Sequence, residues 1–356
     1  MVRRQFALML VFAFAGCAMG YSSSASPYTA SGAARSATSQ WVFVATDNHY
    51  SSRRSHGAVW AFPPSLAAPV IVRRGVAYPG SIAIDGKGDL FVANADSKIA
   101  IYAPPYTGSP RYLKHRYLSA KIAIDRNDNL FVLSSTRFFS KTIQELRPPY
   151  ASVSVTIPQD RRDTPQELAF DVRGNLLVSY ALNVVRQYLA PTFTSVGGVA
   201  KLPTGGNIID IGVNANNQLF VLHAFREHNN TSGVNIFIYD IEGSAISLLH
   251  APVSVDNQAF HLAVKRTGSA FISSDNGVYE LRGPAYDSIT LHSVLQNYAF
   301  FGLIAVEDNG DLILTGRDAE LGSIVSLSAP PYGGIAASRR IQNSAIGPTA
   351  IALGPP

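Results

Sequence analysis

The sequence contains a single cysteine, Cys17, so the chain cannot form an internal disulfide and its stability must come from packing. No long amphipathic helix pattern is present either. Three common catalytic motifs are also missing: the Gly-x-Ser-x-Gly nucleophile elbow, the glycine-rich phosphate loop and the dinucleotide-binding fingerprint. These absences remove elbow-type hydrolases, phosphate-loop nucleotidases and Rossmann dehydrogenases from the candidate functions.

An internal repeat dominates the rest of the chain. Each copy has an apolar–small–apolar triplet, a polar turn and a second, almost wholly apolar run. The triplets begin at Ile82, Ile122, Leu168, Ile211, Leu262 and Ile304. Their start-to-start spacings of 40, 46, 43, 51 and 42 residues match the length of a four-stranded propeller blade. The repeat therefore predicts an all-β fold made of one β-propeller.

The two ends of the chain complete the blade count. Trp41–Ala45 resembles a second strand without a first strand before it, and Ile351–Leu353 resembles a first strand without a second after it. Together they predict a seventh blade, closed by pairing of the N- and C-terminal strands, which leaves no unpaired sheet edge at the junction. The alternative is six blades, with the C-terminal residues as a simple tail.

The sequence from Ile82 to Asp85, followed by Asp89 to Asn94, resembles the repeat of NHL-type propellers and of the related SMP-30/gluconolactonase-like propellers. The resemblance extends from about Trp41 to Leu353 and implies the propeller architecture. SMP-30-like enzymes hold one divalent metal through a Glu, two Asn and an Asp. The resemblance assigns parts of that set to Glu167, to Asn94, and to Asp275 or Asp210.

The first twenty residues are expected to be a targeting segment. Arg3 and Arg4 precede an apolar stretch, Phe6–Ala15, that is too short to span a membrane. Phe14–Cys17 resembles a bacterial lipobox, which predicts lipidation of Cys17; the alternative is plain secretion with cleavage after Ala15. The expected organisation is a signal peptide at 1–20, a flexible tether rich in Ser and Ala at 21–40, and the propeller domain at 41–356.

The charge of the chain gives no sign of nucleic-acid binding. The net charge is +5, and it falls to 5 − 2 = +3 when Arg3 and Arg4 leave with the signal peptide. The arginine pairs are scattered over different repeats, whereas a nucleic-acid surface needs clustered basic and aromatic residues. We therefore expect no nucleic-acid partner.

One group of polar residues stands at the same place in successive repeats, directly before the triplet. It consists of Ser81, Lys121, Glu167, Asp210 and His261. If the register holds, these residues surround the mouth of the central channel, where loops on a rigid scaffold carry function. Asn94, Asp275 and the loop from His223 to His228 are further candidates near this mouth. The alternative is that they are ordinary polar residues at strand ends.

These observations predict a binding or protein-interaction module of the cell envelope, without a cofactor and without catalysis. Its ligand at the channel mouth would be a protein, a small molecule or a carbohydrate, and its membrane contact would be the lipid at Cys17. The alternative is a metal-dependent lactonase or other hydrolase of the SMP-30-like type, holding one divalent cation such as Ca or Zn through residues of the channel mouth.

Overall fold

The computed structural model describes residues 22–23, 40–46, 57–63, 69–114, 118–135, 141–157, 159, 164–203, 206–226, 232–255, 258–292, 300–318, 322–328, 337–342 and 348–354. Within these ranges, every regular element is a β-strand. None of the described residues forms a helix long and apolar enough to cross a membrane.

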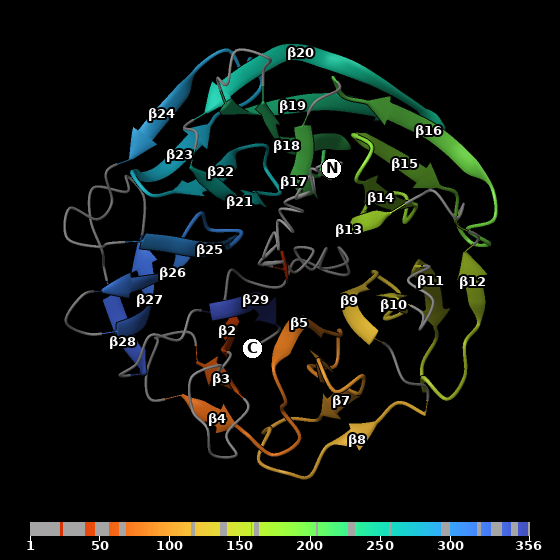
Figure 1. Cartoon of the computed structure of the whole chain (residues 1–356), viewed down its shortest axis with the longest axis vertical. Coiled ribbons are helices and arrows are strands. Elements are labelled where there is room, and N and C mark those ends of the chain that lie inside the picture. The colour runs from red at the N-terminus through yellow and green to blue at the C-terminus, as the bar shows by residue number, and fades with distance from the viewer. Residues whose placement is uncertain are drawn as a thin grey trace, which may run out of the picture.

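Six sheets each come from one stretch of chain, and Figure 1 shows the sheets arranged like blades around a common axis. The strands of each sheet are given from the innermost to the outermost. The first three sheets are β5 (Pro79–Ile84), β6 (Leu90–Asn94), β7 (Ile99–Tyr102) and β8 (Arg111–Tyr112); β9 (Leu118–Ile124), β10 (Leu130–Ser135), β11 (Lys141–Leu146) and β12 (Val155–Ile157); and β13 (Pro165–Phe170), β14 (Leu176–Tyr180), β15 (Val184–Tyr188) and β16 (Val196–Lys201).

The next three sheets follow the same antiparallel order, and their outermost strands lie on the rim in Figure 1. They are β17 (Gly206–Val213), β18 (Gln218–Arg226), β19 (Ser232–Glu242) and β20 (Ala245–Val255); β21 (Ala259–Val264), β22 (Ala270–Ser274), β23 (Gly277–Leu281) and β24 (Ile289–His292); and β25 (Phe300–Val306), β26 (Leu312–Asp318), β27 (Gly322–Ser328) and β28 (Ala337–Gln342).

A seventh sheet joins the two ends of the chain. Strand β29 (Pro348–Gly354) pairs antiparallel with β2 (Trp41–Thr46), which continues into β3 (Ala58–Phe62) and β4 (Val70–Val72). Val42 lies opposite Leu353, and Val44 lies opposite Ile351. The predicted closure by terminal strands is confirmed. The two-residue strand β1 (Ser22–Ser23) pairs in parallel with the other edge of β29, within the segment predicted to be a tether.

Apolar side chains of neighbouring sheets pack against each other. Because side chains alternate along a strand, each strand contributes to the layers on both of its faces. On β5, Ile82 and Ile84 pack with Phe43 of the preceding blade, whereas Ala83 faces the next blade and joins a cluster with Ile122. The second residue of each triplet is small because innermost strands crowd together around the axis. The core is therefore a set of layers between blades, and each blade depends on both of its neighbours.

The turn between the first and second strands explains the acidic residue of the repeat. Asp125 Oδ1 accepts hydrogen bonds from the backbone N–H groups of Asn127 and Asn129, both at 2.8 Å. Asp85, Asp171 and Asn214 make the equivalent pairs of bonds. The third residue after this position has a positive φ in all six turns. These residues are Gly88, Asp128, Gly174, Asn217, Gly268 and Gly310. Gly, Asn and Asp tolerate this conformation best, so the turn residues follow from local geometry.

The proline-rich turns supply aromatic side chains that lock adjacent blades together. Tyr150 is 5% exposed, and its ring packs edge-on against Phe91 of the preceding blade with 5.0 Å between centroids. Its hydroxyl donates to the carbonyl of Asp128 at 2.8 Å. The same aromatic contact recurs between Phe43 and Tyr106, Phe131 and Phe193, and Phe220 and Tyr286. Without a disulfide, this repeated contact is a main link between blades.

Candidate functional site

The five polar residues predicted at the mouth, Ser81, Lys121, Glu167, Asp210 and His261, occupy equivalent positions on β5, β9, β13, β17 and β21. We call them the mouth ring. Pairing of the innermost two strands shifts register at or beside this position in all seven sheets. A bulge re-aims the side chain of the residue it contains. The fold therefore places these side chains by a repeated device at one end of the innermost strands.

Two members of the mouth ring fasten one blade to the next. Ser81 Oγ accepts the backbone N–H of Ile122 at 3.1 Å, and Asp210 Oδ2 accepts the backbone N–H of Leu262 at 3.0 Å. The other oxygen of Asp210 accepts the N–H of Ile211 at 2.8 Å. These hydrogen bonds from backbone N–H groups offset the free-energy cost of burying the Ser81 hydroxyl and the Asp210 carboxylate. Part of the mouth ring is thus structural.

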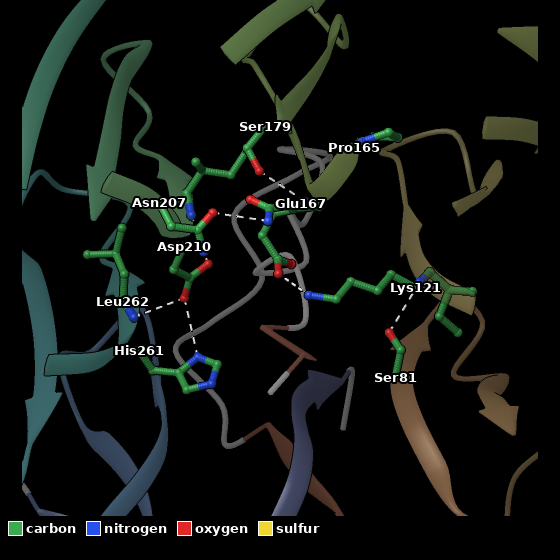
Figure 2. A network of polar contacts seen from close by, with 12 residues as sticks. Ser81, Lys121, Pro165, Glu167, Ser179, Asn207, Asp210, His261 and Leu262 are labelled. Carbon is green, nitrogen blue, oxygen red and sulfur yellow. Dashed lines mark hydrogen bonds and ion pairs between the residues drawn. The ribbon is translucent and has the colours of Figure 1, made fainter. Parts of the chain in front are cut away.

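Asp210 and His261 form the first of two side-chain pairs between neighbouring blades. His261 Nδ1 lies 3.3 Å from Asp210 Oδ2, and their side chains are 4% and 1% exposed. Figure 2 shows the imidazole directly beside the carboxylate, with both projecting from the ends of their strands. The carboxylate fixes the orientation of the imidazole.

Lys121 and Glu167 form the second pair. The Lys121 ammonium is in direct contact with Glu167 Oε1, and the two side chains are 23% and 6% exposed. Figure 2 shows the Lys121 side chain extended toward the Glu167 carboxylate, so the pair joins two consecutive blades. Burial lowers the pKa of Lys121 to about 8; the charge of Asp210 opposes this shift and the charge of Lys141 adds to it. The cluster therefore holds a partly accessible amine among carboxylates.

A second polar contact lies beside these pairs. Gln166 Nε2 donates to Asn207 Oδ1 at 3.1 Å, linking β13 to β17. Gln166 Oε1 is buried and accepts no hydrogen bond from the described residues. Lys141 Nζ donates to the carbonyl of Pro165 at 2.7 Å, linking β11 to β13. Three consecutive blades thus contribute polar groups around Lys121 and Glu167.

The lowered pKa of Lys121 predicts an unusual reactivity profile. The rate of acylation of its amine should rise with a midpoint near pH 8, because only the neutral amine reacts. The pKa of an ordinary lysine is about 10.4. Pulse labelling with acetic anhydride across pH 6 to 11, read by peptide mass spectrometry, measures this midpoint. The Lys121→Arg variant identifies the labelled peptide. A rate that rises only above pH 10 would contradict the assigned burial.

The other sequence candidates take different positions. The amide of Asn94 accepts the N–H of Ala77 at 2.8 Å and donates to the carbonyl of Gly75 at 2.9 Å, so it fastens the loop that enters β5. Asp275 lies half-buried in the turn between β22 and β23. The two side-chain hydrogen bonds of Asn94 thus serve its own loop and do not involve the mouth ring. The Cys17 prediction lies outside the described part of the chain.

His223 was predicted as part of a polar loop, but it lies within β18 and is 1% exposed. Its ring packs edge-on against Phe237 with 5.8 Å between centroids. Burial lowers the pKa of His223, so its neutral form is favoured. Glu227 and His228 lie outside the described residues. Among the residues that are described, no three His, Cys, Asp or Glu side chains are grouped so that they could hold a metal ion.

No sequence pattern singled out Gln166, Asn207 or Ser179. Ser179 Oγ accepts the backbone N–H of Glu167 at 3.0 Å and so fixes the start of the triplet on β13. Gln166 and Asn207 both precede a mouth-ring residue on their own strands. Gln166 stands one position before Glu167 and Asn207 three positions before Asp210, so the repeat does not align them with each other.

Comparison with known proteins supports the fold. No protein-family model and no curated protein sequence matches the chain. A solved structure of a protein from Lactobacillus plantarum matches with a TM-score of 0.63 at 12% identity, covering 89% of this chain and 99% of that one. The β-propeller domain of Cps50 (Swd1) from Myceliophteria thermophila gives 0.58 at 15%, covering 83% and 98%. Streptogramin B lyase gives 0.54 at 11%, covering 77% and 86%. At these identities the likeness establishes a β-propeller and nothing finer.

Proposed function

We propose that this propeller is a binding module that recognises its ligand at the mouth ring. The observation that carries the proposal is the convergence of Lys121, Glu167, Asp210 and His261 from four consecutive blades. Burying charged groups costs free energy, and apolar residues would hold blades together without that cost. A propeller offers a rigid scaffold on which loops and strand ends from several blades meet, which suits recognition.

The finer resemblance to NHL-type or SMP-30-like propellers is part of this proposal, as is the location of the protein. We propose an extracytoplasmic module held at the cell envelope by a lipid on Cys17. Propellers of the kind that the sequence resembles include binders and scaffolds as well as enzymes, so a binding role is compatible with the resemblance. Streptogramin B lyase shows that a protein of similar fold can be an enzyme. The two side-chain pairs of the mouth ring support a binding function more directly than they support any reaction step.

The proposal predicts that ligand-induced stabilisation depends on the mouth ring. The full chain, Glu167→Gln, Asp210→Asn and the double variant would be screened by thermal shift against sugars, amino acids, peptides, organic acids, nucleotides, Ca²⁺ and Zn²⁺. A ligand that binds only the folded state raises the melting temperature by mass action. We expect at least one compound to stabilise the wild type and to lose at least half of that shift in the double variant.

Glu242→Gln is the matched control, because Glu242 is exposed at the end of β19, outside the mouth ring. It should retain the full ligand shift. A screen in which no compound's effect depends on Glu167 or Asp210 would contradict the proposal, and the mouth ring would then serve only to join blades.

A further inference from the structure

The charges of the mouth ring are compensated within the protein. Lys121 is neutralised by Glu167, and Asp210 accepts two backbone N–H groups and lies beside His261. An anionic ligand would have to take Lys121 away from Glu167, and a cationic ligand would have to take Glu167 away from Lys121. Removing one partner from a buried ion pair leaves an uncompensated charge, which is strongly unfavourable. The site therefore disfavours ligands that carry a full charge.

Hydrogen-bonding capacity nevertheless remains unused at the same place. Lys121 Nζ has three N–H donors, and within the described residues it donates to Glu167 alone. Glu167 Oε2 accepts no hydrogen bond from any described residue, although the carboxylate is only 6% exposed. Lys121 is 23% exposed, so solvent reaches this pair. An ammonium donor and a carboxylate acceptor thus lie side by side, held by two different blades.

Further unused capacity lies on the neighbouring residue of β13. Gln166 Oε1 is buried without a partner among the described residues, while its Nε2 is held by Asn207. A buried polar atom without a hydrogen bond costs free energy, and a ligand hydroxyl that reached it would recover that loss. The donor and acceptors of this region belong to neutral amides or to a neutralised ion pair.

We propose that the mouth ring recognises an uncharged polyhydroxylated ligand, that is, a neutral saccharide, through Lys121 and Glu167. This inference rests on the proposed binding function. A hydroxyl group both donates and accepts hydrogen bonds. Of two adjacent sugar hydroxyls, one donates to Glu167 Oε2 and the other accepts from Lys121 Nζ, and the ion pair stays intact. Charge-assisted hydrogen bonds of this kind are stronger than bonds between neutral groups.

The test is binding of the full chain to immobilised oligosaccharides on a common linker: neutral glucans, mannans and galactans, their uronic-acid counterparts, and their amino-sugar counterparts. We expect a neutral oligosaccharide to bind. Glu167→Gln and Lys121→Met should each weaken that binding at least tenfold, whereas Glu242→Gln should leave it unchanged. Melting temperatures of all variants are measured first, and Lys121→Gln, which also removes the cationic donor, replaces Lys121→Met if the latter fails to fold.

A change in the ligand provides a test that needs no variant. The per-O-methylated form of the bound sugar keeps the ring but has no hydroxyl donor, so its affinity should fall at least tenfold. Binding confined to the acidic or amino sugars would overturn the inference and leave the proposed binding function standing. If no sugar binds but the thermal-shift screen identifies another ligand, the saccharide inference is likewise overturned and the proposed binding function stands. Neutral-sugar binding that none of the mouth-ring variants alters would overturn both.

Discussion

Deleting Pro348–Pro356 should destabilise the whole propeller. The deletion removes β29, the strand that pairs with β2 in the closing sheet, and with it the buried side chains of Ile351 and Leu353, which are 2% and 4% exposed. Each large aliphatic side chain contributes about 1.5–3 kcal/mol by burial, so these two side chains alone account for about 3–6 kcal/mol. The deletion also leaves the edge of β2 without its partner strand. We expect no cooperative unfolding transition, or one lowered by more than about 10 °C, in a thermal melt followed by circular dichroism.

The control is deletion of Pro355 and Pro356 alone, which leaves β29 complete. This shorter truncation should melt within about 2 °C of the wild type, since surface changes outside packed elements cost within about 0.5 kcal/mol. A full deletion that melts like the control would show that the C-terminal strand does not close the ring in solution.

Among the aromatic residues of the proline-rich turns, Tyr150 should be the one whose replacement by alanine destabilises the protein most. Tyr150 packs against Phe91 of the preceding blade, and its hydroxyl reaches both Asp128 O at 2.8 Å and Asp85 Oδ2 at 3.2 Å. Removing a large buried aromatic costs about 3–5 kcal/mol. Tyr150→Phe should cost about 1–3 kcal/mol, because it leaves a buried carboxylate oxygen and a carbonyl without this donor. Urea unfolding, read by fluorescence, measures both values.

Tyr112→Ala is the matched control, because Tyr112 lies on the outermost strand β8 and is 42% exposed. Its loss should cost less than about 1 kcal/mol. Equal costs for Tyr150→Ala and Tyr112→Ala would contradict the role assigned to the aromatic contact between blades.

The repeat allowed the architecture to be predicted, because one blade pattern occurs often enough to reveal its strands and its polar turn. Even the closing blade followed from two incomplete copies at the ends of the chain. The contacts between blades were less accessible. The Pro-Pro-Tyr segments were interpreted as turns, and their tyrosines gave no sign of packing on the preceding blade. That contact joins residues such as Phe91 and Tyr150, which are far apart in sequence, and no local pattern encodes it.

The candidate site was predictable in position but not in its bonding. Equivalent places in successive repeats identified Lys121, Glu167, Asp210 and His261. Which neighbours pair depends on the register shift at each blade, and that shift leaves no local sequence signature. Asn94 shows the opposite case: a polar residue after a second strand is used by its own loop. His223 belongs to an extended strand that the average blade length did not predict.

A crystal structure of the protein with the tightest-binding neutral oligosaccharide tests the central claim most directly. The account predicts electron density for the sugar at the mouth ring, with one hydroxyl within hydrogen-bond distance of Lys121 Nζ and a neighbouring hydroxyl within that distance of Glu167 Oε2. The contact between Lys121 and Glu167 should persist in the complex. Density for the sugar only on the outer strands of the rim, or a complex in which Lys121 has left Glu167, would contradict it.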